Sequence, residues 1–278
     1  SNAVELTRLR ALVIGDSGIG KTTSLGTLPE NRTLIAVCER GLLPLRHKKF
    51  NVAIIETWDD VRGLIRDLQA AEQTPKGVTY NGQEISILAV DSLGDLGEMC
   101  KRQIVGVDRK KLVADRTGGK KETPAGIYDE QMTQEDWGLY GTRMRGMLGA
   151  VTHLPLHVIF TCLTAWKEDK RTGAIYRTVN LNGQLALECP SFFDVVVHME
   201  NGTGGNGQPA RVWRTANNGQ VIAKDSLGIL DELETSTNWT VLFQKVFAKP
   251  AAEPVTVTPP QEPPAQSETP KSTRRKAA

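Results

Sequence analysis

The sequence predicts an α/β fold in which a mostly parallel, twisted sheet is flanked by helices. Short apolar runs alternate with segments of helical periodicity along most of the chain, which is the pattern of parallel strands joined by crossover helices. A glycine-rich turn at 15–22 follows the first apolar run and opens the first helical segment. The chain of 278 residues is long enough for one large domain of this class, and its length does not demand two.

Strands are expected where apolar runs are short and bounded by polar residues. They cover residues 11–14, 33–38, 52–55, 85–90, 157–162 and 194–199, with a hairpin around 211–214. Helices are expected from residue 21, after Thr57, at 134–151 and at 238–247. Asp60 follows Thr57 by three residues, as the acid of a capping box does. The helix at 134–151 is expected to be capped by Thr133 and to turn Trp137, Tyr140, Met144, Met147 and Leu148 inward.

The two ends of the chain are expected to lie outside the folded domain. Ser1-Asn2-Ala3 resembles the remnant of a removed tag, which leaves residues 4–247 for the domain. Residues 248–278 hold seven prolines and few large apolar side chains, so this segment cannot bury enough surface to offset its ordering entropy. We expect a disordered tail whose basic end is either solvated or a contact for nucleic acid or a protein partner.

Composition excludes several classes of protein. Hydrophobic residues at 39% and charged residues at 24% are ordinary for a soluble globular protein. No apolar run approaches the roughly 18 residues of a membrane span, and no secretory signal is evident, so we expect a cytoplasmic protein that does not bind membranes. The four cysteines are not spaced as CxxC pairs, which favours buried free thiols over a zinc site. The net charge of +2 says little about partners.

Residues 15–22 follow the pattern G-x-x-x-x-G-K-T of a phosphate-binding loop. The glycines let the backbone turn tightly and point its N–H groups at phosphate oxygens, and the following helix adds its positive end. Lys21 is expected to place its charge at the β- and γ-phosphates, and the Thr22 hydroxyl is a natural Mg²⁺ ligand. The sequence therefore predicts a site for ATP and Mg²⁺ formed by Gly15, Asp16, Ser17, Gly18, Ile19, Gly20, Lys21, Thr22 and Thr23.

Two acids follow predicted strands and are candidates for the chemistry of this site. Asp91 ends the apolar run at 85–90, at the edge of the sheet where ligands bind in open α/β folds, and we expect it to hold Mg²⁺. The alternative is an aspartate that caps the next helix. Glu39 ends the run at 33–38, where a carboxylate can orient and deprotonate an attacking water. The alternative there is a solvated loop acid.

The order of these parts resembles the core of the RecA-like recombinases. The likeness rests on the phosphate loop, on Asp91-Ser92-Leu93, and on the stretches 158–161, 181–187 and 194–197. The chain also resembles phage-encoded AAA-type nucleotide-binding proteins, which include RadA-like single-strand annealing ATPases. In these proteins the second strand commonly ends in an acid plus glycine, as Glu39-Arg40-Gly41 does here. The resemblance covers residues 8–247.

The resemblance implies roles for particular residues. Glu39 would be the catalytic base, Lys21 the phosphate-binding cation, and Thr161 or Thr164 the group that senses the γ-phosphate. ATP would lie between the subunits of a ring or filament, and Lys224 is the candidate cation that acts on a neighbour's nucleotide, with a surface lysine as the alternative. A phage protein of this kind works in the host cytoplasm. The chain departs from RecA at Cys162-Leu163, where RecA continues into Asn-Gln, so the coupling of nucleotide to the following loop is open.

Two basic segments lie where the resembled family places DNA-binding loops. Between residues 101 and 121, eight basic residues stand against two acids, and contacts to phosphates there would give sequence-independent affinity. Residues 166–182 combine basic with aromatic side chains, and 169–173 is a predicted hairpin turn; stacking on single-stranded bases suits this composition. A solvated surface segment is the alternative for each. The candidate DNA contacts are Arg109, Lys110, Lys111, Lys120, Lys121, Lys167, Lys170 and Arg171.

Three functions are compatible with these features. The first is an ATPase of phage recombination that assembles on single-stranded DNA and promotes annealing or pairing. The second is a nucleotide-dependent switch or loader that recruits a replication or recombination protein of phage or host through the tail. The third is a small-molecule kinase, which would need an arginine-rich lid; Arg143 and Arg145 are the nearest candidates, but the helical pattern around them argues against a lid.

Overall fold

The computed structural model of the chain describes residues 8–38, 41–108 and 132–248. The chain divides between Phe247 and Ala248 into two units, and the first unit contains all the elements given below. The expected tag remnant at 1–3 lies outside the described residues, and so does the expected tail from residue 249 onward. No helix in the described ranges combines the length and the apolar character needed to cross a membrane.

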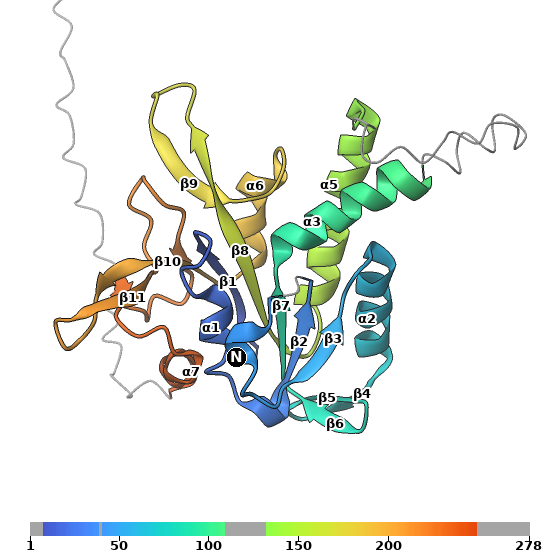
Figure 1. Ribbon diagram of the computed structural model, residues 1–278, viewed down its shortest axis with the longest axis horizontal. Coiled ribbons are helices and arrows are strands. Elements are labelled where there is room, and N and C mark those ends of the chain that lie inside the picture. Colours follow the sequence, from blue (N-terminus) through green and yellow to red (C-terminus); the bar gives the residue numbers. More distant parts are fainter. Residues whose placement is uncertain (1–7, 39–40, 109–131, 249–278) are drawn as a thin grey trace, which may run out of the picture. The chain divides into compact units, whose positions relative to one another are not determined.

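A ten-stranded sheet organises the described part of the chain (Figure 1). Its main path runs in the order β13-β11-β10-β1-β8-β7-β2-β3, and the six strands from β10 to β3 are parallel. These six are β1 (Arg10–Gly15), β2 (Thr33–Val37), β3 (Asn51–Ile54), β7 (Ile87–Asp91), β8 (His157–Glu168) and β10 (Val195–Thr203). The others each join a neighbour in antiparallel fashion: β9 (Ile175–Val179), β11 (Pro209–Arg214), β12 (Lys224–Asp225) and β13 (Leu233–Glu234).

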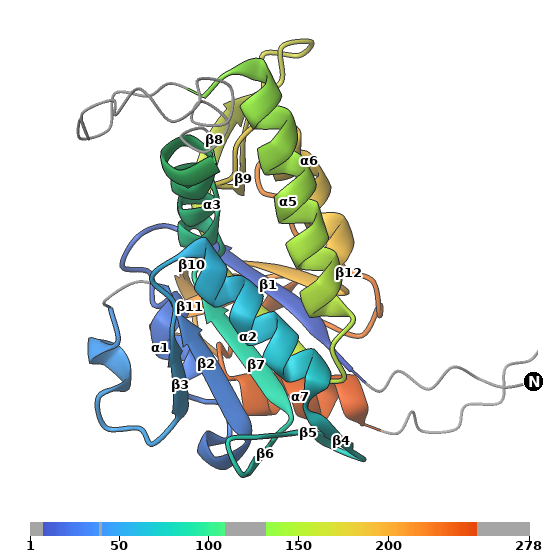
Figure 2. The same ribbon diagram turned by 90° about the vertical axis from the view of Figure 1, so that its right-hand side faces the viewer.

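Helices cover both faces of this sheet (Figures 1 and 2). One face carries α2 (Trp58–Ala70), α3 (Leu93–Arg102) and α5 (Gln134–Thr152), and the other carries α1 (Lys21–Leu25) and α7 (Trp239–Phe247). Alternate residues of β1 divide between the two faces, as the period of a strand requires. Leu12 and Ile14 lie in the core under α2, α3 and α5, whereas Ala11 and Val13 lie in the core with α1 and α7. The predicted α/β fold with a mostly parallel sheet is confirmed.

Short elements complete the described fold. A separate three-stranded sheet contains β4 (Glu72–Thr74), β5 (Gly77–Tyr80) and β6 (Gln83–Ile85). The other short elements are three 3-10 turns, one α-helical turn and one π-helical turn. They are η1 (Glu30–Arg32), η2 (Leu43–Leu45), η4 (Cys189–Phe192), α6 (Leu185–Glu188) and η3 (Gln103–Asp108). The sequence did not predict the small sheet, because its strands carry mostly polar side chains and no apolar run.

Most expected strands are present, with one large difference in length. The strand expected at 157–162 continues to Glu168, and its extension pairs with β9 across the predicted turn at 169–173. Gly173 adopts φ 70°, which favours glycine at this turn. The extension was not predicted as strand because it lies outside the core, where the alternation of apolar and polar residues is no longer required.

Both predicted helix caps are confirmed, and one predicted core residue is wrong. Thr57 and Thr133 each accept a hydrogen bond from the backbone N–H of the aspartate three residues later, and each aspartate closes the capping box. Trp137, however, is 40% exposed and meets Tyr140 edge to face. The reason is that the first turns of α5 lie beyond the sheet, and burial along this helix begins only at Tyr140.

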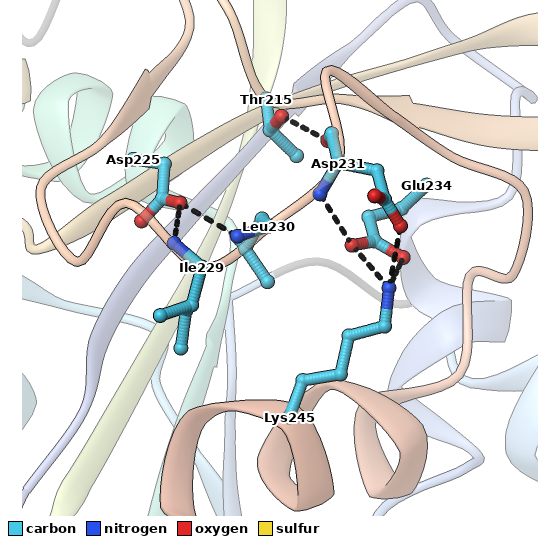
Figure 3. Close-up of polar contacts among 7 residues, drawn as sticks. All are labelled: Thr215, Asp225, Ile229, Leu230, Asp231, Glu234 and Lys245. Carbon is cyan, nitrogen blue, oxygen red and sulfur yellow. Dashed lines mark hydrogen bonds and ion pairs between the residues drawn. The ribbon is translucent and has the colours of Figure 1, made fainter. Parts of the chain in front are cut away.

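A polar network fastens the segment before α7 (Figure 3). Lys245 Nζ lies 2.8 Å from Asp231 Oδ2 and 2.8 Å from both carboxylate oxygens of Glu234, whose side chain is only 8% exposed. These contacts to Asp231 and Glu234 raise the pKa of Lys245. The Asp225 carboxylate accepts hydrogen bonds from the backbone N–H groups of Ile229 and Leu230. The segment between β12 and β13 is therefore held at both ends.

Helix α7 is also joined to the end of the helix that follows the phosphate loop. The backbone N–H of Trp239 donates to Thr27 Oγ1 at 2.9 Å, and the Thr240 hydroxyl donates to the Thr27 carbonyl at 2.9 Å. Trp239 and Trp213 are fully buried, with ring centroids 4.8 Å apart. The last helix thus supports the loop side of the sheet.

Candidate nucleotide-binding site

The phosphate loop lies at the carboxyl end of β1, between β1 and α1. β1 is a central strand, because β8 pairs with one of its edges and β10 with the other. Gly18 and Gly20 adopt φ 73° and φ 106°, a left-handed backbone that favours glycine. Asp16, Ser17 and Gly18 are exposed, so this side of the loop is open to a ligand.

Lys21 holds a buried positive charge within the loop. Lys21 is only 8% exposed, and its Nζ donates hydrogen bonds to the carbonyl oxygens of Gly15 at 2.9 Å and Asp16 at 2.8 Å. The ammonium group is thereby fixed across the loop before any ligand arrives. That Lys21 meets the β- and γ-phosphates stays a prediction.

Asp91, at the carboxyl end of β7, meets the loop directly. The Thr22 hydroxyl donates to Asp91 Oδ2 at 2.7 Å, and the hydroxyl of the fully buried Thr161 donates to Oδ1. The N-cap of the following helix is Ser92. The Asp91 carboxylate is therefore engaged with the loop and with β8, and Ser92, at the N-cap position of α3, makes no side-chain capping hydrogen bond.

The donors at this point suit a small, hard cation. Thr22 and Asp91 offer a hydroxyl and a carboxylate oxygen, which are ligands that Mg²⁺ accepts. Within the described ranges, no cluster of three or more His, Cys, Asp or Glu side chains could hold a metal by itself. Mg²⁺ commonly keeps several waters and takes further oxygens from substrate phosphates, so two protein ligands beside a phosphate loop fit its requirements.

Two residues that were not predicted as site residues, Asp95 and Cys162, lie at the same end of the sheet. Asp95, in the first turn of α3, accepts a hydrogen bond from the Ser92 hydroxyl. Cys162 on β8 is fully buried, and burial raises the pKa of its thiol to about 12, although the charge of Lys21 opposes this shift. The raised pKa favours the protonated thiol, as expected of a buried free cysteine. The spacing Asp-Ser-x-x-Asp could have indicated Asp95, because it places the second acid one helical turn after the strand end.

The structure describes some of the other residues that were predicted to act in catalysis. Glu39 lies outside the described residues. The Thr164 hydroxyl is buried without a hydrogen-bond partner in the described part of the chain, whereas the Thr161 hydroxyl bonds to Asp91. Lys224 Nζ donates to the Phe193 carbonyl at 2.7 Å within the same chain. The roles of these residues toward the γ-phosphate or a neighbour's nucleotide stay predictions.

The β8–β9 hairpin extends beyond the carboxyl ends of the parallel strands, where the phosphate loop also lies (Figures 1 and 2). Trp166 is 62% exposed, and the Arg177 guanidinium lies 4.8 Å from the centroid of its ring. Lys170 and Arg171 lie exposed at the turn, and Lys167 Nζ lies 3.4 Å from the Gly183 carbonyl. The hairpin thus presents an aromatic ring and several cations to solvent.

Arg177 also connects the hairpin to the central strands. Its Nη1 donates to His198 Nε2 at 3.3 Å, and burial lowers the pKa of His198, which keeps the imidazole neutral and able to accept this bond. His198 pairs with Ile14 of β1, directly before the phosphate loop. The other candidate DNA contacts, Arg109, Lys110, Lys111, Lys120 and Lys121, lie outside the described residues.

Comparison with known proteins agrees with this geometry. The model of a family described as "AAA domain" matches residues 7–227, a span that includes the phosphate loop, Asp91 and the β8–β9 hairpin. No curated protein matches the chain.

Proposed function

This chain belongs to the AAA domain family, and we propose that it binds ATP with Mg²⁺, hydrolyses ATP, and acts on single-stranded DNA in annealing or strand pairing. The observation that carries the nucleotide part is the contact of Thr22 with Asp91 beside the buried Lys21. These are the groups that phosphoryl transfer requires at one point: a cation for the phosphates and oxygen ligands for Mg²⁺.

The reaction that fits is attack of water on the γ-phosphorus, which breaks the bond to the β-phosphate oxygen and gives ADP and phosphate. The loop N–H groups and Lys21 would hold the phosphate chain in line for this attack. Thr22 and Asp91 would hold Mg²⁺, which would neutralise charge on the phosphates. Thr161 keeps the Asp91 carboxylate oriented through its hydrogen bond to Oδ1. Glu39 would accept the proton of the attacking water.

Replacing Glu39 with glutamine tests the last assignment. Glutamine keeps the size of the side chain but cannot accept the proton, so we expect ATP binding to be retained and turnover to fall by roughly 10²-fold or more. Phosphate release at saturating ATP measures turnover. Glu56→Gln is the matched control, because Glu56 is an exposed acid that follows the neighbouring strand β3. Equal turnover in wild type and Glu39→Gln would assign Glu39 to the solvated loop.

Two features of the described structure support the DNA part of the proposal. The β8–β9 hairpin extends beyond the carboxyl ends of the parallel strands. The end of α3 and the start of α5, on either side of residues 109–131 in the sequence, extend beyond the same end of the sheet (Figures 1 and 2). The hairpin combines exposed Trp166 with Lys167, Lys170, Arg171 and Arg177. An aromatic face stacks on any base and cations bind the backbone, which gives single-strand affinity without sequence preference. The predicted contacts from Arg109 to Lys121 belong to the same proposal.

The hairpin makes a specific prediction for single-stranded DNA. Trp166→Ala should weaken binding by roughly 5- to 150-fold, from a stacking contribution of about 1–3 kcal/mol per base. The double variant Lys170→Ala/Arg171→Ala should reduce the salt slope by about 1.4, at about 0.7 per phosphate. Fluorescence anisotropy of a labelled oligonucleotide at several salt concentrations measures both effects.

Two controls separate stacking and charge from general damage to the hairpin. Trp166→Phe keeps an aromatic face and should retain most of the affinity. Arg46→Ala/Lys48→Ala removes the same charge around η2, away from the hairpin, and should leave the salt slope unchanged. Unchanged binding by both hairpin variants would remove this segment from the proposal and leave residues 101–121. If the wild type binds no DNA, hydrolyses no ATP, but binds nucleotide, the switch that recruits a partner through the tail replaces the annealing function.

Exposed apolar side chains on an edge strand support the proposed homo-oligomer. β3 lies at one end of the strand order of the main sheet, and its Val52 and Ile54 are 44% and 71% exposed. Apolar side chains exposed together mark protein contacts. The other end of the strand order is β13, so a contact between these unlike edges would repeat as a ring or a filament. Light scattering with and without ATP and DNA tests assembly, and Lys224→Ala mixed with wild-type subunits tests the trans-acting cation.

A kinase of small molecules has less support. Arg143 and Arg145, its nearest lid candidates, lie within the continuous helix α5, and Arg145 is paired with Glu188 at 2.6 Å.

A further inference from the structure

The β10–β11 hairpin brings an arginine to the phosphate loop from the side away from Asp91. In the register of the sheet, Gly15 pairs with Met199 of β10, and two residues further along β10, Asn201 pairs with Arg211 of β11. Arg211 therefore lies at the same edge of the sheet as the loop. Asp91 and Thr161 belong to β7 and β8, on the other side of β1.

The side chain of Arg211 lies directly against Gly20 of the loop. A methyl group on Gly20 would be 2.5 Å from Arg211 Nη1, 2.8 Å from Cζ and 3.0 Å from Cδ. The guanidinium group thus packs on the α-carbon of the residue that precedes Lys21. Glycine is required here twice, because φ is 106° and because Arg211 occupies the space of a side chain.

Within the described ranges, Arg211 has no charge partner that explains its position. Among the described residues, its guanidinium group makes no hydrogen bond or ion pair, and the residue is exposed. Arg214, three residues along the same strand, is by contrast held by Glu200 through Nε at 3.0 Å and Nη2 at 2.7 Å. One arginine of β11 is therefore neutralised within the fold, whereas the other places free donors beside a loop that is built for anions.

We infer that Arg211 is a second cation of the nucleotide site, supplied by the same chain, and that it binds the α- and β-phosphate oxygens. This inference rests on the proposed binding of ATP. Thr22 and Asp91 place the metal, and with it the γ-phosphate, toward β7 and β8. The phosphate chain must leave the loop in the other direction, toward β10 and β11, where the Arg211 guanidinium lies over Gly20. Its planar set of donors suits adjacent phosphate oxygens.

Nucleotide affinity of the full chain tests this assignment. Dissociation constants for ATP, ADP and inorganic triphosphate are measured by calorimetry for wild type, Arg211→Gln, Arg211→Lys and Arg214→Gln. We expect Arg211→Gln to raise the dissociation constants of all three ligands by about 10- to 100-fold, which is the range for loss of a hydrogen bond to a charged group. Arg211→Lys should recover part of the loss. Arg214→Gln removes the same charge from the same strand and should bind like wild type.

Each other outcome overturns a defined part of the inference. Wild-type affinity in Arg211→Gln removes Arg211 from the site. A loss for ATP and ADP without a loss for triphosphate assigns Arg211 to the nucleoside, and a loss for ATP alone assigns it to the γ-phosphate. Failure of the wild type to bind any of the ligands overturns the proposed function itself, together with this inference. The melting temperature of Arg211→Gln should equal that of wild type, because the side chain forms no hydrogen bond or ion pair within the described part of the chain.

Discussion

Replacing Lys21 with alanine is expected to abolish measurable ATP turnover and to weaken ATP binding. The ammonium group of Lys21 is fixed across the phosphate loop by the carbonyls of Gly15 and Asp16, where the β- and γ-phosphates are expected. Loss of one preorganised group that stabilises developing charge costs about 10²- to 10³-fold in rate. Turnover should fall by at least this factor, because ground-state binding of the phosphates is lost as well. Phosphate release over a range of ATP concentrations separates the two effects.

Two further measurements guard the interpretation of Lys21→Ala. Lys48→Ala removes the same charge from an exposed lysine paired with Glu30 and should turn over ATP like wild type. Thermal unfolding without nucleotide shows whether loss of the two hydrogen bonds across the loop alters the fold. A folded Lys21→Ala variant with wild-type turnover would overturn the assignment of residues 15–22 as the nucleotide site.

Replacing Asp91 with asparagine is expected to have the next largest effect, and to act through Mg²⁺. The Thr22 and Thr161 hydroxyls donate to the two oxygens of the Asp91 carboxylate. Asparagine offers only one acceptor oxygen, so one hydroxyl must turn, and the charge that attracts Mg²⁺ is lost. Metal assistance is worth several kcal/mol at a phosphoryl centre, so we expect turnover to fall by about 10²- to 10³-fold and the Mg²⁺ concentration for half-maximal turnover to rise.

Binding without metal is the internal control for Asp91→Asn. Because the phosphate loop and Lys21 are unchanged, ADP affinity in the presence of a chelator should match that of wild type. If chelated ADP binding falls as much as turnover does, Asp91 supports the shape of the loop rather than the metal.

The arrangement of the candidate site was predictable from the sequence where its residues are close together along the chain. The glycines, Lys21 and Thr22 are consecutive, and Asp91 follows an apolar run, so each could be placed at the end of a strand without knowledge of tertiary contacts. The caps at Thr57 and Thr133 were predictable for the same reason, since both partners lie within three residues.

Contacts between distant segments were not predictable. The sequence around Arg211 and Arg214 does not indicate their partners, yet one lies over Gly20 and the other is held by Glu200. Thr161 was expected to meet the γ-phosphate. Its hydrogen bond to Asp91 became evident only in the structure, where β7 and β8 are neighbours. Trp137 has the helical spacing of a core residue, but spacing does not tell how far a helix extends past the sheet that it covers.

The central position of β1 has a consequence for how the chain is made. Both of its partner strands come late: Leu9 donates to His157, 148 residues away, and Arg10 donates to Asp194, 184 residues away. At about 5–20 residues per second, synthesis of that interval takes roughly 10 to 40 s, during which β1 has no partner. Pairing over such distances is intrinsically slow and leaves apolar strands open to aggregation. The phosphate loop is therefore translated early, but it acquires its shape only after β8 and β10 have been translated. Nucleotide can consequently stabilise only a nearly complete domain.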